Sequence, residues 1–240
     1  LPFIIMILIS RYLMTHKDSK IVKDIFAGLR PAIIGFLSKW ITEYVSKHST
    51  NPIYDDLMGP TKLKLREILY EEQLGLCCYC CRKLNYPYTH SDDSHIEHFK
   101  PKGNLKYSSL SLEYTNLHLS CSGYRNQKDC CGHKKKDWFD EELTISPLED
   151  NVDNLFEYSI DGHIMAASNN NRAISTIDNL DLDSFNLQRQ RKTAIYVSGL
   201  FDDDFDEDKR EMIIDEYSSE IDGVLKSFCN AVLYCVKNNV

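Results

Sequence analysis

The chain has 240 residues, which is enough for one large domain or for a small catalytic module with helical additions. Its formal net charge of −8 argues against a simple nucleic-acid-binding protein, because such proteins carry an excess of basic residues. The charge is unevenly spread, however. Residues 60–136 hold 13 of the 28 basic and 8 of the 36 acidic residues, a balance of +5, which leaves 15 basic and 28 acidic residues elsewhere, a balance of −13. The basic segment suits a site that meets phosphate, although a solvated basic face would have the same composition.

The first residues predict neither a secretory signal nor a membrane span. Residues 1–9 are apolar, but no basic region precedes them and no small-residue cleavage site follows them. The run is also shorter than the ~20 apolar residues that cross a bilayer. We therefore expect a cytoplasmic protein with reduced thiols and no membrane partner, in which clustered cysteines bind metal rather than form disulfides.

Two helices are expected before the cysteines. Apolar residues recur at three- and four-residue steps over residues 18–48, which predicts a helix that breaks or kinks at Pro31. A second helix is predicted over residues 61–73, with Gly75 as its C-terminal cap. Both are most simply scaffold.

Seven of the nine cysteines lie between residues 77 and 131 and predict a structural zinc site. Thiolates from two separate segments are what a tetrahedral zinc ion needs to tie those segments together, and no open coordination position is evident. The doublets leave alternatives. Either Cys77 with Cys80 or Cys78 with Cys81 gives a CxxC knuckle, and Cys121 with either Cys131 or Cys130 completes a set of four.

Between the cysteine clusters, the run His95-Ile96-Glu97-His98 is the candidate catalytic feature. It falls on a predicted strand over residues 94–99, and a second strand is predicted over residues 117–121, followed by a helix over residues 134–143. Because side chains alternate along a strand, Glu97 can hold a metal on one face while His98 accepts a proton on the other. The alternatives are that the run only packs against the fold, or that His95 and His98 are zinc ligands.

The remaining sequence predicts a hairpin and three helices. Residues 156–164 read as a β-hairpin that turns at Asp161-Gly162. Helices are expected over residues 171–180, over residues 183–197 with Asp183 or Ser184 as N-cap, and, after an acidic patch at 202–208, over residues 209–236. We divide the chain into an N-terminal helical segment, a zinc-stabilised core with the candidate catalytic residues, and a hairpin-plus-helix region that we expect to dock a partner, with the bounds 1–60, 61–150 and 151–240.

Four motifs in order carry a family resemblance. They are Cys-x-x-Cys, His-Ile-Glu-His-Phe-Lys-Pro-Lys from residue 95, Asn-Leu-x-Leu-Ser-Cys from residue 116 and Cys-Gly-His-Lys-Lys from residue 131. In this order they resemble the HNH endonuclease subunit of retron and Septu-type anti-phage defence systems, the PtuB-like family. The resemblance extends from about Leu65 to Arg191. It implies an α+β protein in which a small zinc-stabilised ββα-metal (HNH) core is embedded in mainly helical structure.

The resemblance also implies roles for particular residues. His98 would be the general base and Glu97 a ligand of a catalytic Mg²⁺ or Mn²⁺, while Asn116 fills the middle HNH position and braces the loop. The third position departs from the family pattern, because Cys121 is followed by a nine-residue insert. His133 is our first choice for the second metal contact, and Asn126 is the second choice.

Three further residues are expected to shape the site or to contact phosphate. They are His95, Lys100 and Lys102. The zinc ligands in this interpretation are Cys77, Cys80, Cys121 and Cys131.

The partners are likewise implied by the resemblance. An SMC-like or ABC-like ATPase subunit would control the nuclease, and in retron systems a reverse transcriptase with its own DNA product would join the complex. The target would be DNA, with tRNA as a second candidate. Two competing hypotheses are a non-catalytic zinc-stabilised adaptor, whose basic segment only docks nucleic acid or a partner, and a CxxC thiol oxidoreductase, which lacks the βαβ context.

Overall fold

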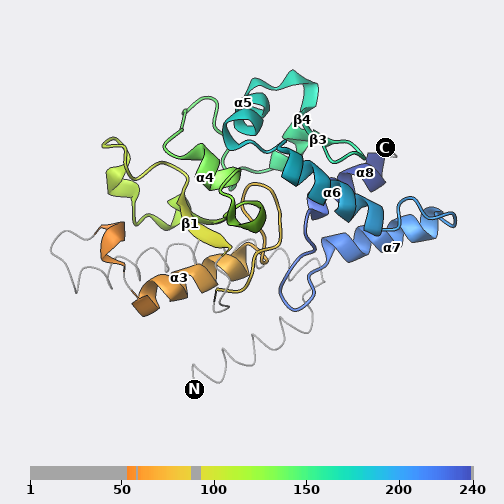
Figure 1. The fold of residues 1–240 in the computed structure, drawn as a ribbon, viewed down its shortest axis with the longest axis horizontal. Helices are drawn as coiled ribbons and strands as arrows, with labels where there is room; N and C mark the ends of the chain where they lie inside the picture. Colours follow the sequence, from red (N-terminus) through yellow and green to blue (C-terminus); the bar gives the residue numbers. More distant parts are fainter. Residues whose placement is uncertain (1–52, 58, 88–92, 239–240) are drawn as a thin grey trace, which may run out of the picture. The chain divides into compact units, whose positions relative to one another are not determined.

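The computed structural model describes residues 53–57, 59–87 and 93–238 (Figure 1). Helix α3 is the first long element in these ranges. The helix expected over residues 18–48 lies outside these ranges. The described part is mixed α/β, with six α-helices and two two-stranded sheets, joined by short 3-10 turns. In chain order the elements are α3 (Gly59–Glu72), β1 (Ser94–His98), β2 (Leu117–Cys121), α4 (Cys131–Lys135), β3 (Phe156–Tyr158), β4 (Ile164–Ala166), α5 (Asn171–Leu180), α6 (Phe185–Val197), α7 (Glu207–Ser218) and α8 (Cys229–Asn238).

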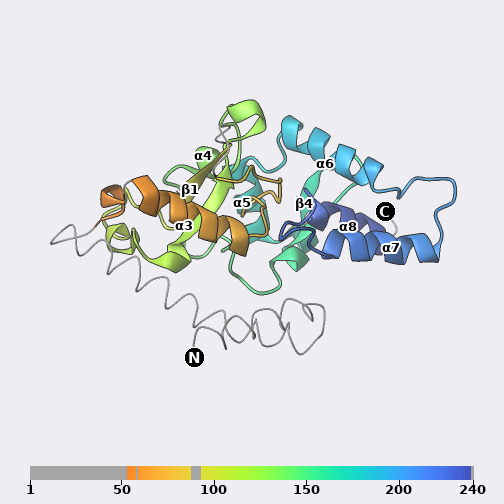
Figure 2. The ribbon, with the colours of Figure 1, turned by 90° about the horizontal axis from the view of Figure 1, so that it is seen from below.

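The antiparallel pair β1–β2 organises the half of the molecule that carries the predicted site. Glu97 lies opposite His118 and His95 lies opposite Ser120, so these four side chains share one face of the pair. Helices α3 and α4 both contact β2, and Figures 1 and 2 show them on opposite sides of β1. The predicted strands are therefore confirmed, apart from Phe99, which follows β1 instead of ending it.

The helix predicted over residues 134–143 is wrong. Helix α4 starts earlier, at Cys131, and ends at Lys135 because Lys136 adopts a positive φ of 51°. Beyond α4, the carboxylate of Asp140 accepts hydrogen bonds from the backbone N–H groups of Glu142 and Leu143. A tight turn thus replaces the expected helical continuation.

The second sheet forms as predicted. β3 and β4 pair antiparallel, and the chain reverses at Gly162, whose φ of 86° fits the turn. Helix α5 has the predicted bounds and packs against β4 and α4, while α6 starts after Ser184. Arg191 of α6 is 2% exposed and donates hydrogen bonds to the carbonyl oxygens of Gly162 and Leu182, which anchors α6 to the hairpin.

The single helix predicted over residues 209–236 is also wrong, because the structure has two helices there. The apolar stripe is real, but Asp222 and Gly223 both have positive φ, and Ile221 and Val224 hydrogen-bond across them in a tight turn. This turn separates α7 from α8, which pack against each other. None of the helices in the described ranges is long and apolar enough to cross a membrane.

Candidate metal centre and active site

Four buried cysteines meet at one point of the structure. The sulfur atoms of Cys77, Cys80, Cys121 and Cys131 all lie within 4.8 Å of one another. The Cys80 and Cys121 sulfurs are 3.8 Å apart, and a tetrahedral zinc ion with Zn–S bonds of about 2.3 Å places its sulfurs about 3.8 Å apart. All nine cysteines of the chain are free thiols. The arrangement therefore suggests a structural metal site for an ion such as zinc.

Local backbone geometry selects one cysteine from each doublet. A bridge between Leu76 and Lys83 closes the knuckle, in which the N–H of Cys81 bonds to the carbonyl of Cys77. Cys78 and Cys81 turn away and line a separate cavity of about 80 Å³. Burial raises the pKa of the Cys78 and Cys81 thiols well above the ordinary value, so both stay protonated. Cys130, the residue immediately before α4, is not part of the four-cysteine group.

The four clustered thiols favour a cation by their charge. Burial opposes ionisation of Cys77, but hydrogen bonds from Cys121 and Cys131 outweigh burial and place its pKa well below the ordinary value. Hydrogen bonds with Cys121, Cys130 and Cys77 raise the pKa of Cys131 well above the ordinary value. One thiolate thus forms readily and opposes the next, and a divalent ion removes that opposition because it attracts all four.

Glu97 is the most heavily partnered carboxylate of the site. Its Oε1 lies 2.9 Å from Nζ of Lys135 and accepts a 3.3 Å hydrogen bond from Tyr79, and its Oε2 lies 3.4 Å from Nε2 of His95. Burial opposes ionisation, but the interactions with His95 and Lys135 outweigh it and lower the pKa of Glu97. Lys135 also donates to the carbonyl oxygen of His98, so it ties Glu97 to the backbone beside it.

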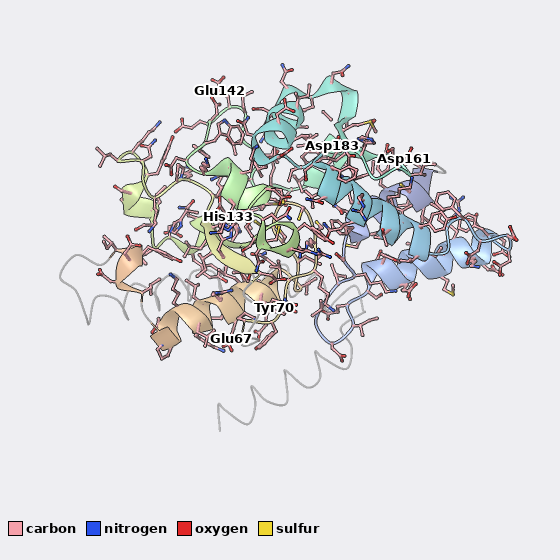
Figure 3. All side chains as sticks on the ribbon, in the orientation of Figure 1. Glu67, Tyr70, His133, Glu142, Asp161 and Asp183 are labelled. Carbon is pink, nitrogen blue, oxygen red and sulfur yellow. The ribbon has the colours of Figure 1, made fainter. Side chains whose placement is uncertain are left out.

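Gly132 lets α4 approach this face of β1 closely. A Cβ atom at Gly132 would lie 2.4 Å from Oε2 of Glu97 and 2.7 Å from Nε2 of His95, which no side chain tolerates without movement. The next residue, His133, lies on the side of α4 that faces β1 (Figure 3), and its ring centroid is 4.0 Å from that of His95. His95 also has a buried Nδ1 atom with no hydrogen-bond partner in the described chain. The structure thus brings Glu97, His95 and His133 together.

The groups around Glu97 include side chains of the kinds that bind divalent cations. A carboxylate with neighbouring imidazoles suits transition metals such as Mn²⁺. Among the described residues, the four cysteines form the one group of three or more His, Cys, Asp or Glu side chains whose ligand atoms all lie within 4.8 Å of one another. The ligand atoms of Glu97, His95 and His133 are therefore more widely spaced than those of the cysteines. Asn126, the alternative ligand, is exposed in the turn before α4.

His98 points to the other face of β1 and has a defined tautomer. Its Nε2 lies 3.0 Å from the carbonyl oxygen of Ser111, which can only accept, so Nε2 carries the proton and Nδ1 carries the lone pair. The ring packs edge-on against Tyr54, with centroids 4.4 Å apart. Burial lowers the pKa of His98 below 6.5, so the ring is neutral at pH 7.

Asn116 braces the loop between the two strands. Its Oδ1 accepts a 2.6 Å hydrogen bond from the N–H of Lys100, and its Nδ2 donates to the carbonyl oxygens of Lys100 and Leu110, at 3.0 and 3.1 Å. It is 4% exposed, and its contacts are all with backbone. Because Leu110 precedes Ser111, Asn116 also positions the carbonyl that holds His98. The side chain acts on the loop and does not reach the Glu97 group.

The two predicted phosphate contacts lie in the first turn after β1. Lys100 Nζ lies 5.7 and 5.6 Å from the ring centroids of Tyr107 and Phe139. Lys102 Nζ lies 4.9 Å from the ring centroid of Tyr54 and forms an exposed ion pair with Asp55. Lys102 thus lies beside Tyr54, the ring that packs against His98.

Several important residues could not be found from the sequence. Lys135 is fully buried against Glu97, yet in sequence it is the middle of three consecutive lysines. His118 lies opposite Glu97, is 5% exposed, and leaves its Nε2 without a partner in the described chain. Burial lowers the pKa of His118 to about 4. Strand alternation was the available signal for His118, because it places residues 118 and 120 on one face once the register is known.

Comparison with known proteins gave no assignment: no family model matches the chain, and no curated protein matches it.

Proposed function

We propose that the chain is a metal-dependent endonuclease of the HNH type, which hydrolyses phosphodiester bonds, and that β1, β2 and α4 form its ββα-metal core. One observation carries the proposal: the carboxylate of Glu97 meets the imidazoles of His95 and His133 on one face of β1, with neutral His98 on the other face. Burying so many titratable groups in one short strand pair is costly, and a chemical role accounts for that cost.

In this proposal His98 is the general base. The Ser111 carbonyl keeps the proton on Nε2, so Nδ1 can take a proton from the attacking water. The lowered pKa keeps the ring in its basic form at pH 7. Asn116 is a positioning residue, because it holds the backbone next to Ser111. Lys100 and Lys102 would contact the phosphates of the nucleic acid.

Glu97 and His133 would hold the Mg²⁺ or Mn²⁺ ion. When bound, the ion would stabilise the negative charge that develops on the phosphate. Imidazole suits Mn²⁺ better than Mg²⁺, which prefers oxygen ligands, so activity with Mn²⁺ should exceed that with Mg²⁺. The four-cysteine cluster would hold zinc at the end of β2 and the start of α4, and would thus fix α4 against the strand pair β1–β2.

The motif resemblance extends the proposal to a place in anti-phage defence. The chain would be the effector of a complex with an SMC-like or ABC-like ATPase and, in the retron form, with a reverse transcriptase and its DNA product. DNA is the expected target, and tRNA is the second candidate. The balance of −13 outside residues 60–136 weakens long-range attraction of bare nucleic acid. We therefore expect slow cleavage by the isolated chain and faster cleavage when a partner presents substrate.

A second candidate function is favoured by the environment of Glu97. Lys135, Tyr79 and His95 already give this carboxylate a complete set of partners, as in a purely structural buried ion pair. In that case the chain would be a non-catalytic zinc-stabilised adaptor whose basic segment docks nucleic acid or a partner. The two candidates differ in what Mn²⁺ does to the protein, because an adaptor has no second metal site.

The test uses the zinc-loaded full chain, alone and purified with the protein of its genomic neighbour. Addition of Mn²⁺ should produce nicking of supercoiled DNA or cleavage of tRNA, and EDTA should stop it. Glu97→Gln should abolish cleavage, while the matched control Glu141→Gln, which removes an exposed carboxylate paired with Lys106, should retain it. Absence of metal-dependent cleavage in both preparations would favour the adaptor.

A further inference from the structure

A second hollow of the molecule lies apart from the Glu97 and His98 group. It is an open cavity of about 620 Å³, within the roughly 300–1,000 Å³ that small-ligand sites occupy. Four separate stretches line it, and none of the residues assigned above to metal binding or catalysis is among them. The stretches are the end of the cysteine knuckle at Lys83, the turn after β2 at Tyr124, one side of α6 and residues 217–228.

The lining of this cavity is cationic in an acidic protein. Lys83, Arg189 and Lys226 line it, and no aspartate or glutamate does, although the chain has 36 acidic and 28 basic residues. Lys226 forms an ion pair with Glu216. Neither Lys83 nor Arg189 forms an ion pair with a carboxylate in the part of the chain that the structure describes, and both are exposed. The cavity therefore offers two unneutralised cations to an anion.

Aromatic rings accompany these cations. Tyr124, Tyr217 and Phe228 line the cavity. At its edge the guanidinium of Arg189 lies 5.6 Å from the ring centroid of Phe185, which is 69% exposed. A solvated Arg–Phe pair on a convex surface would need no explanation, but here the pair borders a concave, aromatic-lined site. Tyr217 and Phe228 are almost fully buried, so Tyr124, which is half-buried, is the lining ring that can stack on a base. A ring next to free cations is the combination that stacks nucleobases and holds phosphate.

The wall that carries Arg189 is held in place by the fold. Two residues further along α6, Arg191 is buried and bonded to the carbonyl oxygens of Gly162 and Leu182. On the opposite wall, the N–H of Lys83 donates a 3.0 Å hydrogen bond to the hydroxyl of Ser227. The two cations thus extend from fixed backbones, which reduces the ordering cost of binding a ligand between them.

We propose that this cavity binds a nucleotide, with its phosphate between Lys83 and Arg189 and its base against the ring of Tyr124. A free nucleotide and one unit of a single-stranded nucleic acid share this chemistry. The proposal goes beyond the nuclease assignment and does not depend on it, because binding here uses neither Glu97 nor His98.

The test measures binding to the full chain carrying His98→Ala, so that a strand is not cut during titration. The probes are a fluorescent adenosine triphosphate analogue and a fluorescein-labelled single-stranded oligothymidine, followed by anisotropy at fixed salt. Arg189→Gln and Lys83→Gln should each weaken binding about tenfold. The matched control is Lys192→Gln, which removes an exposed charge from the same helix, paired with Asp161 and outside the lining.

The two probes separate the sources of the ligand. Binding of the triphosphate that is weakened by Arg189→Gln assigns a free nucleotide, and weakened binding of the strand alone assigns a nucleic-acid strand. Zinc content and melting temperature should match in all variants, since the substituted side chains are exposed. Saturable binding of neither probe, or equal affinities for the Arg189→Gln and Lys192→Gln proteins, would overturn the proposal.

Discussion

The neighbouring cysteines Cys77 and Cys78 provide a matched test of the metal centre. Cys77→Ser removes one of the four clustered sulfurs, whereas Cys78→Ser changes a thiol that lines the 80 Å³ cavity instead. Structural zinc contributes about 10–16 kcal/mol to folding in zinc-finger peptides. That is comparable to the whole stability of a domain, about 5–15 kcal/mol. Loss of the ion should therefore unfold the region around β1, β2 and α4.

Cys78→Ser should have a much smaller effect. Burying its hydroxyl without a partner costs about 1–3 kcal/mol, which corresponds to a melting temperature about 2–12 °C lower in a domain of this size. Metal analysis of the purified proteins, together with thermal unfolding, measures both quantities. We expect about one zinc per chain in the wild type and in Cys78→Ser, and little zinc or insoluble protein for Cys77→Ser. A folded Cys77→Ser protein with a full complement of zinc, or a folded wild type without zinc, would refute the reasoning.

Three further predictions concern residues around the strand pair β1–β2. Gly132→Ala should gain about 1 kcal/mol of helix propensity but lose about 1–3 kcal/mol because the added methyl group overlaps Glu97 and His95. Chemical denaturation should therefore show no gain in stability, and cleavage should fall. Asn116→Ala removes three hydrogen bonds to backbone, so the free energy of unfolding should fall by about 2–4 kcal/mol; an unchanged value would contradict the bracing role. His118 has a pKa of about 4 in the folded chain and about 6.5 in the unfolded chain. Between these two pH values the unfolded state binds more protons, so the free energy of unfolding should fall by about 3 kcal/mol as the pH drops from 6.5 to 4. Denaturation at each pH should show a shallower decline for His118→Gln.

The sequence predicted the elements that rest on local pattern. Strand alternation located β1 and β2, and Asp161-Gly162 marked the hairpin turn. The spacing of the cysteines predicted a four-thiolate site but left open which member of each doublet takes part, and the structure brings together Cys77, Cys80, Cys121 and Cys131. In each case the determining signal lies within a few residues, or in a ligand type whose chemistry is specific.

The errors and omissions share a different cause. The stripe over residues 209–236 is compatible with one long helix, and only the turn at Asp222-Gly223 divides it. Lys135 is distinguished from its two lysine neighbours by which side of α4 faces β1, and that depends on packing. The nucleotide-sized cavity combines Lys83 with Arg189, more than a hundred positions apart in sequence. Such juxtapositions follow from tertiary contacts and leave no periodic signature.

The most direct measurement of the central claim is the cleavage rate of His98→Ala, in the preparation that contains the proposed ATPase partner and Mn²⁺. Removal of a general base should lower the rate about 10²–10⁴-fold, while zinc content and partner binding stay unchanged. His163→Ala is the matched control, because this histidine is exposed and pairs with Asp183, away from the hairpin of β1 and β2. The account predicts wild-type cleavage by His163→Ala and a rate at least about 100-fold lower for His98→Ala. Cleavage at the wild-type rate by His98→Ala would contradict it.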